Sequence, residues 1–537
     1  MLLILVLLGL VLSIGFLDVV ELILKLIGAD VGPQVAGSFI ERMPLSLVYV
    51  FLFLNLLVAI LAVYKEKFFL ENIQKALFYI KEAFVHLFKG LTFPETVVMI
   101  VIPLLSAIYF ASSIPVSYDE AATYNYFTVK PFYFSMIFYP YPNNHVLHSL
   151  FTNLTEYIPF LSPLFSIRIP VLFASLFTWL IAYSFIKKYY NSNTALLIVG
   201  LVSAMYMSIY YSFMSRGYAF MVLAFIVCMY ATFNIISKGD RSKDWMFFVI
   251  SGALGCYAIP SFLYPFATLN VIILFYNYKN IKKQVIWNML AGSLVILLYA
   301  PIMIVDGIAA LTSNQFVQSV DRFFIVQNIF YFCQAMIAEI VGGSYTLIML
   351  IYVLFIPLAY AIYRRDKKYI LLWFVFMLAP FALLFLHAVN PFYRTFLYYN
   401  FIVAFLLVVP FSKLLNKAPK IGVLIFILSI QAVGVYSFNG KIAAKEGFNT
   451  DVSKVVKTYF KTENKILFPC IASENYKFEA KVQGLESQID FYENKKVNVD
   501  TVSTVYDYVI VEKKRDQTQI RQPYASSNSQ NIYKNGR

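Results

Sequence analysis

The chain has 537 residues, of which 60% are hydrophobic, 18% are aromatic and only 13% are charged. Soluble domains average about 45–50% apolar and about 25% charged residues, so this composition excludes a water-soluble enzyme, a disordered scaffold and a fibrous protein. The formal net charge is +14, but the basic residues are scattered through short connections. That distribution argues against a nucleic-acid-binding face, and we expect the chain to lie in a membrane.

Apolar segments that are long enough to cross a bilayer recur along the whole chain. A spanning helix needs roughly 20 mostly apolar residues, and this test predicts about thirteen spans. The predicted spans are 2–24, 44–64, 95–114, 169–186, 194–213, 217–237, 245–260, 262–278, 285–304, 344–363, 369–387, 396–412 and 421–438. Residues 326–341 are apolar but interrupted, and we interpret them as interfacial or re-entrant. The sequence therefore predicts an all-α polytopic membrane protein.

The connections between these spans differ in their content of basic residues. One alternate set carries twenty Lys and Arg residues, whereas the other set carries six. The six are Arg42, Lys130, Arg168, Arg216, Arg322 and Arg394. Because cytoplasmic loops carry the excess of Lys and Arg, we expect a cytoplasmic N-terminus and an extracytoplasmic C-terminus in the plasma (inner) membrane.

The pattern of spans and polar stretches divides the chain into five parts. They are an N-terminal transmembrane hairpin (1–64), a cytoplasmic interfacial amphipathic helix (65–93), a transmembrane core (94–438) with an outer loop at 115–168, a small extracytoplasmic α/β domain (439–516) and a disordered tail (517–537). Lysines among apolar residues at helical spacing are typical of an interfacial helix. The α/β domain is predicted because DVSKVVKTYFK has a helical pattern, and KILFPCIA and DYVIVEK resemble buried strands.

Polar residues gather in the first outer loop. It opens with SYDEAATYNYF, which places Asp119 and Glu120 directly after a span, and it continues with YPYPNNHVLHSLF, which contains Asn144, His145 and His148. On a helix, the two histidines would share one face. Such a cluster can supply a general base, hold a divalent metal ion or bind an acceptor. The alternative is a solvated loop whose amides and histidines cap helices.

Two arginines lie at outer ends of spans. The segment SRGYAF contains Arg216 and Tyr218, and HAVNPFYRTFLYY contains Tyr393 and Arg394. A guanidinium fits a phosphate through a fixed fork of donors, although a single arginine at a helix end is explained by snorkelling. Two arginines on the face that is otherwise poor in basic charge favour an anionic ligand, such as a lipid-linked phosphate whose chain stays in the bilayer.

Taken in order, these motifs resemble the polytopic GT-C glycosyltransferases, nearest to the protein mannosyltransferase and lipid A aminoarabinose transferase superfamily (glycosyltransferase family 39-like). The acidic pair stands where the family has an acid in its first outer loop, and PNNHVLH stands where it has a short Pro-containing or His-containing motif. YYSFMSRGYAF and PFYRTFLYY resemble its two arginine elements, and the likeness covers roughly residues 94–510. Relatives often carry an acid just before the first of these arginines. This chain has Met214 and Ser215 there, so a second catalytic acid is not evident.

The resemblance implies transfer of a sugar from a polyprenyl-phosphate-linked donor to a lipid, glycan or protein acceptor at the extracytoplasmic face, by inverting in-line displacement. Asp119 would be the general base, and Glu120 would orient it or act as an alternative base. The implied donor phosphate-binding residues are Arg216, Tyr218, Tyr393 and Arg394. The residues implied for binding the acceptor or a divalent metal are Asn144, His145 and His148. Membrane lipids are the other expected partners, and no nucleic acid is expected.

Other functions would use the same charges. A transporter or flippase for a lipid-linked sugar would use them to bind its ligand at the entrance of the transport path. An envelope polysaccharide ligase or polymerase would use the same phosphate contacts and a polymeric acceptor. A structural envelope protein would leave the cluster unexplained. Transporters often show two related halves and ionisable sites near the midplane, whereas this sequence has no obvious internal repeat. We therefore favour a glycosyltransferase.

Overall fold

A computed structural model describes residues 71–534 with gaps at 72–73, 76, 83–84, 86, 88–90, 140–142, 239–240, 313–318, 343–346, 460–464, 470–472, 483, 485–488, 493–498, 502–505, 514–515 and 519–521. The predicted hairpin at 1–64 and the first residues of the predicted interfacial helix at 65–93 lie outside the described residues. The described residues from 71 to 87 are helical. The fold is therefore described from there onward.

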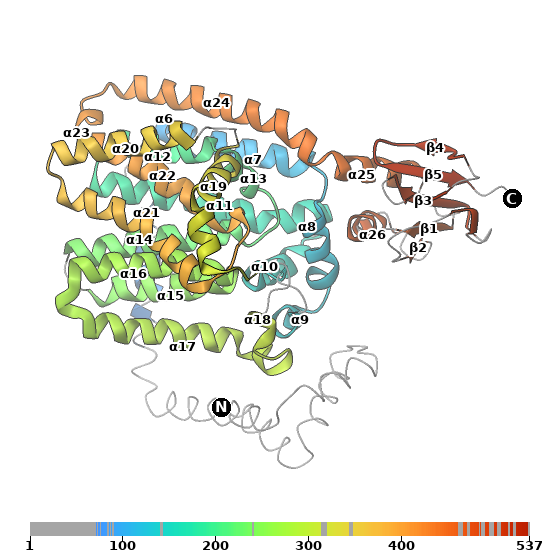
Figure 1. Ribbon diagram of the computed structural model, residues 1–537, viewed down its shortest axis with the longest axis horizontal. Helices are drawn as coiled ribbons and strands as arrows, with labels where there is room; N and C mark the ends of the chain where they lie inside the picture. Colours follow the sequence, from blue (N-terminus) through green and yellow to red (C-terminus); the bar gives the residue numbers. More distant parts are fainter. Residues whose placement is uncertain are drawn as a thin grey trace, which may run out of the picture.

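Long apolar helices, together with short helical turns between them, form the core of the molecule (Figure 1). They are α6 (Phe93–Thr96), η1 (Val97–Val101), α7 (Ile102–Ser113), α11 (Pro163–Tyr189), α12 (Ser192–Ala204), α13 (Tyr206–Tyr211), α14 (Tyr218–Lys238), α15 (Ser242–Ala258), η3 (Pro260–Phe262), α16 (Leu263–Asn277), η4 (Tyr278–Asn280), α17 (Ile281–Val305), α18 (Ala309–Thr312), α19 (Arg322–Val341), α20 (Leu347–Tyr363), α21 (Lys367–His387), η5 (Tyr393–Phe396), α22 (Tyr399–Val408), η6 (Val409–Phe411), α23 (Ser412–Leu415) and α24 (Lys420–Lys445). In the described part of the chain, seven helical segments are long and apolar enough to cross a membrane. Every predicted span from residue 95 onward falls on one or more of these helices.

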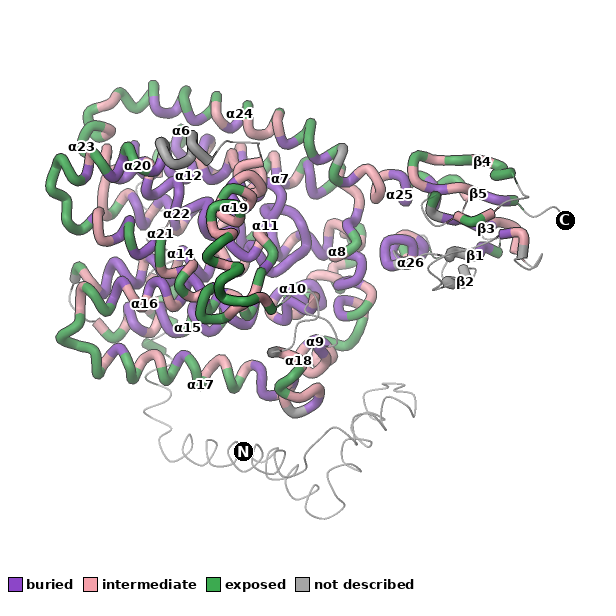
Figure 2. The backbone as a smooth tube through the Cα atoms, viewed as in Figure 1, coloured by how far each residue is buried: buried purple, intermediate pink, exposed green. Residues whose placement is uncertain are grey.

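The outward faces of the peripheral helices are apolar. α17 exposes Met289 and Ile296, and α24 exposes Ile425 and Val433, each by more than half of its surface. Figure 2 shows exposed residues recurring along both helices. Large contiguous apolar surfaces are uncommon on soluble proteins and mark contact with a membrane or a partner. Together with the long apolar helices, these faces are those of a polytopic membrane protein.

Two segments differ from the prediction. The span expected at 194–213 is broken at Met205, whose extended backbone separates α12 from α13 and turns the chain toward the Arg216 loop. Residues 326–341 were expected to be interrupted, but they belong to the continuous helix α19, which is long enough to span. The polar residues of α19 lower its hydropathy without breaking it, because none is Pro or Gly, and the helix ends only at the left-handed Gly342.

The loop at 115–168, which is predicted to lie on the outer face, is folded into short helices: α8 (Tyr118–Thr123), η2 (Tyr124–Thr128), α9 (Phe132–Ile137) and α10 (Val146–Glu156). A capping box starts α8. Ser117 Oγ accepts from the Glu120 N–H at 3.3 Å, and Glu120 Oε2 accepts from the Ser117 N–H at 3.0 Å. Figure 1 shows α8 at the end of the bundle, next to the C-terminal domain.

The C-terminal residues form a small α/β domain, as predicted. Its elements are α25 (Gly447–Tyr459), β1 (Ile466–Pro469), α26 (Ser473–Val482), β2 (Ile489–Tyr492), η8 (Val499–Thr501), β3 (Tyr508–Glu512), β4 (Ala525–Ser526) and β5 (Gln530–Lys534). The sheet order is β2-β1-β3-β5-β4, with β1 parallel to β2 and β3, and β5 antiparallel to β3 and β4. Val452 and Val456 of α25 pack on Ile466 and Ile510 of the sheet. The predicted fold class is confirmed.

The predicted disordered tail at 517–537 is wrong for its strand-forming part. β5 pairs with β3 along five residues. Asp451 of α25 accepts from the Ser529 N–H at 2.9 Å, and Asp516 accepts from the Tyr533 hydroxyl at 2.5 Å. The polar composition of the tail suggested disorder, but its order comes from pairing with strands and carboxylates that lie far away in the sequence.

Candidate active site

Asp119 lies between two arginines that come from distant parts of the chain. It is the second residue of α8, and its side chain is 35% exposed. Its Oδ2 lies 3.6 Å from Arg216 Nη2 and 3.3 Å from Arg394 Nη1. The fold thus brings together the predicted base and the two predicted phosphate-binding arginines.

The charges around this carboxylate keep it ionised. The Arg216 guanidinium lowers the pKa of Asp119 below its ordinary value, burial opposes this shift, and Arg394 and Lys445 add to the lowering. Lys445 lies at the end of α24, where its ammonium group stacks on the Tyr210 ring at 4.1 Å. Two further carboxylates, Glu339 and Glu446, interact with Lys445, so Arg216 and Arg394 are the cations that directly contact Asp119.

The Arg216 side chain is held by polar groups of the folded outer loop. It is 5% exposed, and its Nη1 donates to Asn143 Oδ1 and, at 3.4 Å, to Thr123 Oγ1. Asn143 Nδ2 in turn donates to the Asp119 carbonyl at 3.2 Å. The Arg216 Nε is buried and has no partner among the described residues. Asn143 belongs to the polar segment YPYPNNHVLHSLF but is not among the predicted site residues, because nothing in the pair of adjacent asparagines shows which one faces the arginine.

Arg394 reaches the same carboxylate from η5. Its side chain is 31% exposed, and its guanidinium stacks on the Phe392 ring at 4.7 Å. It also lies against the hydroxyls of Tyr211 and Tyr218. The Arg394 Nε is likewise buried and unpaired within the described residues. Tyr218, one of the predicted phosphate-binding residues, therefore lies beside Arg394.

Tyr393 lies differently from the other predicted phosphate-binding residues. Its ring packs against Phe332 of α19, with the ring centroids 5.2 Å apart. Burial raises its pKa, and Tyr331 and Glu339 of the same helix add to this effect. These contacts assign Tyr393 to the packing of η5 on α19, where it supports the neighbouring Arg394.

Glu120 is fully buried and forms a paired network with Arg168. Its carboxylate accepts from Arg168 Nε at 2.9 Å and Nη2 at 2.7 Å, and from the N–H groups of Ser117 at 3.0 Å and Ser215 at 2.7 Å. Each carboxylate oxygen accepts two hydrogen bonds, so no position is left for a substrate proton. This arrangement argues against Glu120 as an alternative base and favours the orienting role, since it fixes both α8 and the residue before Arg216.

Arg168 is a second residue near the site that the sequence did not assign. It is fully buried, and besides Glu120 it donates to the carbonyls of Ala111, Ile114 and Pro115 at 2.7–3.1 Å. All five of its N–H donors are therefore used. The only sequence signal was an arginine at the outer start of a span, which does not identify its partners.

The two histidines are buried and point to different partners. His148 Nε2 lies 3.0 Å from Ser215 Oγ, and His145 Nδ1 lies 3.3 Å from the Ala258 carbonyl. Burial, followed by the charge of Arg216, lowers the pKa of His148 to about 3 and holds that of His145 well below its ordinary value. Both imidazoles are therefore neutral near pH 7.

The residues predicted to bind an acceptor or a metal have protein partners in the structure. Among the described residues, no three His, Cys, Asp or Glu side chains gather closely enough to hold an ion. Asn144 is 1% exposed. Its amide donates to the carbonyls of Ser135 at 2.9 Å and Phe138 at 3.0 Å, and it accepts from Ser149 at 3.0 Å. Asn144 thus holds the turn before α10, and these hydrogen bonds give it a structural role.

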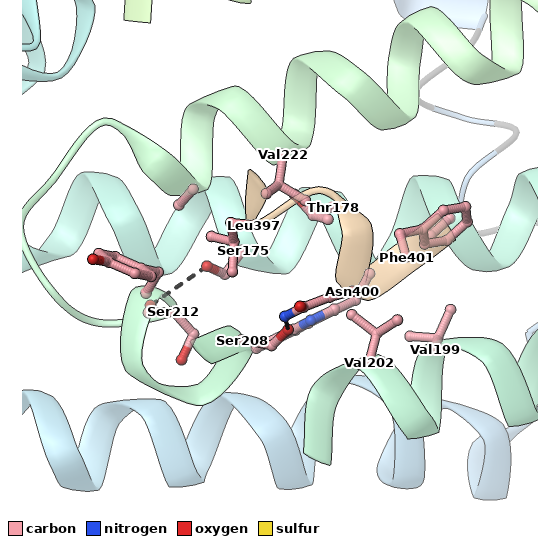
Figure 3. Close-up of a pocket in the computed structure, with 14 residues that line it drawn as sticks. Ser175, Thr178, Val199, Val202, Ser208, Ser212, Val222, Leu397, Asn400 and Phe401 are labelled. Carbon is pink, nitrogen blue, oxygen red and sulfur yellow. Dashed lines mark hydrogen bonds between the residues drawn. The ribbon is translucent and has the colours of Figure 1, made fainter. Parts of the chain in front are cut away.

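A small cavity lies inside the bundle beside this site (Figure 3). Its walls are mostly apolar, and Tyr211 also lines it. The polar members are Ser175, Thr178, Ser208, Ser212 and Asn400. In Figure 3, Asn400 donates to Ser208 Oγ, while the Asn400 Oδ1 is buried without a partner among the described residues. This unpaired oxygen and the neighbouring hydroxyls form one polar corner of an otherwise apolar cavity. None of the charged site residues lines it, so it is separate from the carboxylate site.

Fold and site together define a polytopic helical membrane protein with a carboxylate held between two arginines at one end of its helical bundle. No protein-family model matches the chain, and no curated protein sequence matches it. Among solved structures, it is similar to ArnT from Cupriavidus metallidurans in the apo state, with a TM-score of 0.46 and 8% sequence identity, over 83% of this chain and 94% of that chain. A likeness at this level carries no functional weight.

Proposed function

We propose that this protein transfers a sugar from a polyprenyl-phosphate-linked donor to an acceptor at the extracytoplasmic face of the plasma membrane. The observation that carries the proposal is the convergence of Arg216 and Arg394 on Asp119, each within 3.6 Å. Both arginines also keep a buried, unpaired Nε donor in the described structure. Guanidinium groups with spare donors suit a phosphate, and a carboxylate beside them suits the activation of a hydroxyl.

The proposed reaction is a single in-line displacement. The acceptor hydroxyl oxygen forms a bond to the anomeric carbon while the bond between that carbon and the phosphate oxygen breaks. The bonding electron pair leaves with the phosphate, and the hydroxyl proton passes to an Asp119 carboxylate oxygen. Proton transfer of this kind contributes about 10²–10⁴-fold. The two arginines neutralise the charge that develops on the departing phosphate, which is usually the larger contribution.

The ion pairs of Asp119 also explain how donor binding would activate the base. A carboxylate whose pKa is lowered by Arg216 is a weak base, because it holds a proton poorly. A donor phosphate would compete for both guanidinium groups and add a negative charge beside the carboxylate, and each change raises the pKa of Asp119. The base would therefore strengthen only when the donor is in place.

A turnover assay tests the transferase proposal. The full chain is reconstituted in liposomes with a panel of polyprenyl-phosphate-linked sugars and an envelope lipid extract as acceptor, and released polyprenyl phosphate is measured by mass spectrometry. We expect release by the wild type, and a loss of at least about 10²-fold in Asp119→Asn. Asp321→Asn, which changes an exposed aspartate before α19, is the matched control.

The same liposomes distinguish a transferase from a flippase. A flippase would move the intact sugar-lipid between leaflets without breaking a bond, so movement without release of polyprenyl phosphate would contradict the proposal. Full release by Asp119→Asn would contradict the assignment of the base while leaving the transferase intact.

A further inference from the structure

The helix that carries Asp119 packs against the C-terminal domain. Phe478 of α26 is 2% exposed, and its ring meets the Tyr124 ring edge-on with the centroids 4.8 Å apart. Phe478 shares one buried cluster with Ala121 of α8 and with Ile167 of α11. One side of α8 thus lies on the membrane bundle, and the other lies on α26 (Figure 1).

Polar side chains of α26 hold the segments on both sides of α8. Before α8, the fully buried Asn475 donates to the Val116 carbonyl at 2.9 Å. After α8, Glu474 accepts from Asn125 Nδ2 at 2.8 Å and from the Tyr126 hydroxyl at 3.2 Å. The Glu474 side chain is 5% exposed. α8 has only six residues, and so short a helix has little stability of its own. These contacts hold α8 from the side of the domain, while the Glu120–Arg168 pair holds it from the side of the bundle.

A second contact ties the domain to the bundle next to the site. Glu446, between α24 and α25, is 4% exposed and accepts from the Tyr210 hydroxyl of α13 at 2.9 Å. It also accepts from Asn449, whose Oδ1 accepts from Asn475 Nδ2 at 2.9 Å. A continuous chain of hydrogen bonds therefore runs from α13, which precedes the Arg216 loop, through α25 to α26 and α8.

We propose that α26 is a positioning element for the site, with Glu474 and Phe478 as its positioning residues. The inference rests on the proposed function. Docking of the C-terminal domain on α8 sets the distance between the Asp119 carboxylate and the two arginines, and loosening this contact slows transfer. A displacement of about 1 Å at a reacting group can cost about 10²-fold in rate, so the domain controls turnover without contacting the substrate.

The test compares two glutamates on opposite faces of α26 in the full chain. Glu474→Gln places an amide opposite the Asn125 and Tyr126 donors without changing the side-chain volume. Glu479→Gln is the matched control, because Glu479 faces Lys457 and Ser453 of α25 within the same domain. Amide hydrogen exchange of residues 118–128 is measured together with donor turnover as a function of pH.

We expect Glu474→Gln to speed exchange in residues 118–128 and to lower turnover by about 10–10²-fold, while Glu479→Gln behaves as the wild type. The acid limb of kcat/KM should move to higher pH, because Asp119 loses contact with the arginines that lower its pKa. Phe478→Ala should act in the same way, and Phe478→Leu should restore most of the rate. Equal exchange in the two glutamate variants would overturn the inference.

The two proposals fail separately. If the wild type releases no polyprenyl phosphate, the transferase proposal fails, but the exchange comparison still decides whether α26 holds α8. If the wild type is active and Glu474→Gln keeps full turnover with an unshifted pH profile, the positioning role fails and the transferase stands. Glu474→Gln adds no cavity, so the test does not depend on the folding of Phe478→Ala.

Discussion

Replacing Arg394 should shift the acid limb of kcat/KM, which reports the free protein, more than the acid limb of kcat, which reports the donor complex. Arg394 Nη1 lies 3.3 Å from Asp119 Oδ2, and both side chains are about one-third exposed. At this distance the Coulomb energy is about 1 kcal/mol in water and about 5 kcal/mol at an effective dielectric constant of 20. Screening at such exposure places the interaction near the lower value, at roughly 1–2 kcal/mol, which corresponds to about one pKa unit.

The sign of the effect follows from the charge of the active form. The base works as a carboxylate, so activity is lost as the pH falls through the pKa of Asp119. Arg394 lowers that pKa in the free protein, and Arg394→Ala should therefore move the acid limb of kcat/KM upward by about one pH unit. In the wild type, the acid limb of kcat should already lie at higher pH than that of kcat/KM, because the bound donor phosphate occupies the arginines.

The assay is release of polyprenyl phosphate at a series of pH values, with donor concentrations that span KM. Arg322→Ala, at the exposed start of α19, is the control and should leave both limbs in place. An Arg394→Ala variant that is active but has an unshifted acid limb of kcat/KM would refute the view that this ion pair sets the pKa of the base.

Three further predictions concern stability. Glu120→Gln leaves the buried Arg168 without its carboxylate and should cost about 3–5 kcal/mol in unfolding free energy, seen as a marked fall in melting temperature; a change below 1 °C would contradict the buried pair. Gly217→Ala places a Cβ 2.8 Å from the Ala258 carbonyl oxygen and should destabilise the protein by about 1–3 kcal/mol, and unchanged thermal unfolding would show that the loop relaxes freely. Deleting residues 525–537 removes β4 and β5 and should expose the edge of β3. Protease cleavage in the C-terminal domain should then increase. An unchanged cleavage pattern would show that these strands are dispensable.

The sequence predicts the membrane core well, because a span must be apolar along its whole length whatever its neighbours are. It predicts contacts less well. Asp119 and Glu120 carry the same signal, yet a rotation of about 100° between neighbouring helical residues turns Glu120 toward Arg168 and Asp119 toward the two arginines. The partners of Arg168 are carbonyls at the end of another helix, and no local pattern marks them.

The C-terminal tail shows the same limit. Its residues are polar and have no strong local periodicity, so composition alone indicates disorder. In the structure, β5 is ordered by pairing with β3 and by Asp516, which accepts from Asn531 and Tyr533. Order of this kind depends on long-range pairing and hydrogen bonding, which a local pattern does not contain.

In the proposed reaction, Arg216 and Arg394 hold the donor phosphate beside Asp119. The most direct measurement is an electron cryomicroscopy structure of the full-length Asp119→Asn variant with a polyprenyl-phosphate-linked sugar, since this substitution blocks proton transfer and keeps the side-chain volume. We predict phosphate density within hydrogen-bonding distance of both guanidinium groups, with the anomeric carbon next to residue 119. Donor bound with its phosphate away from these arginines would contradict the account.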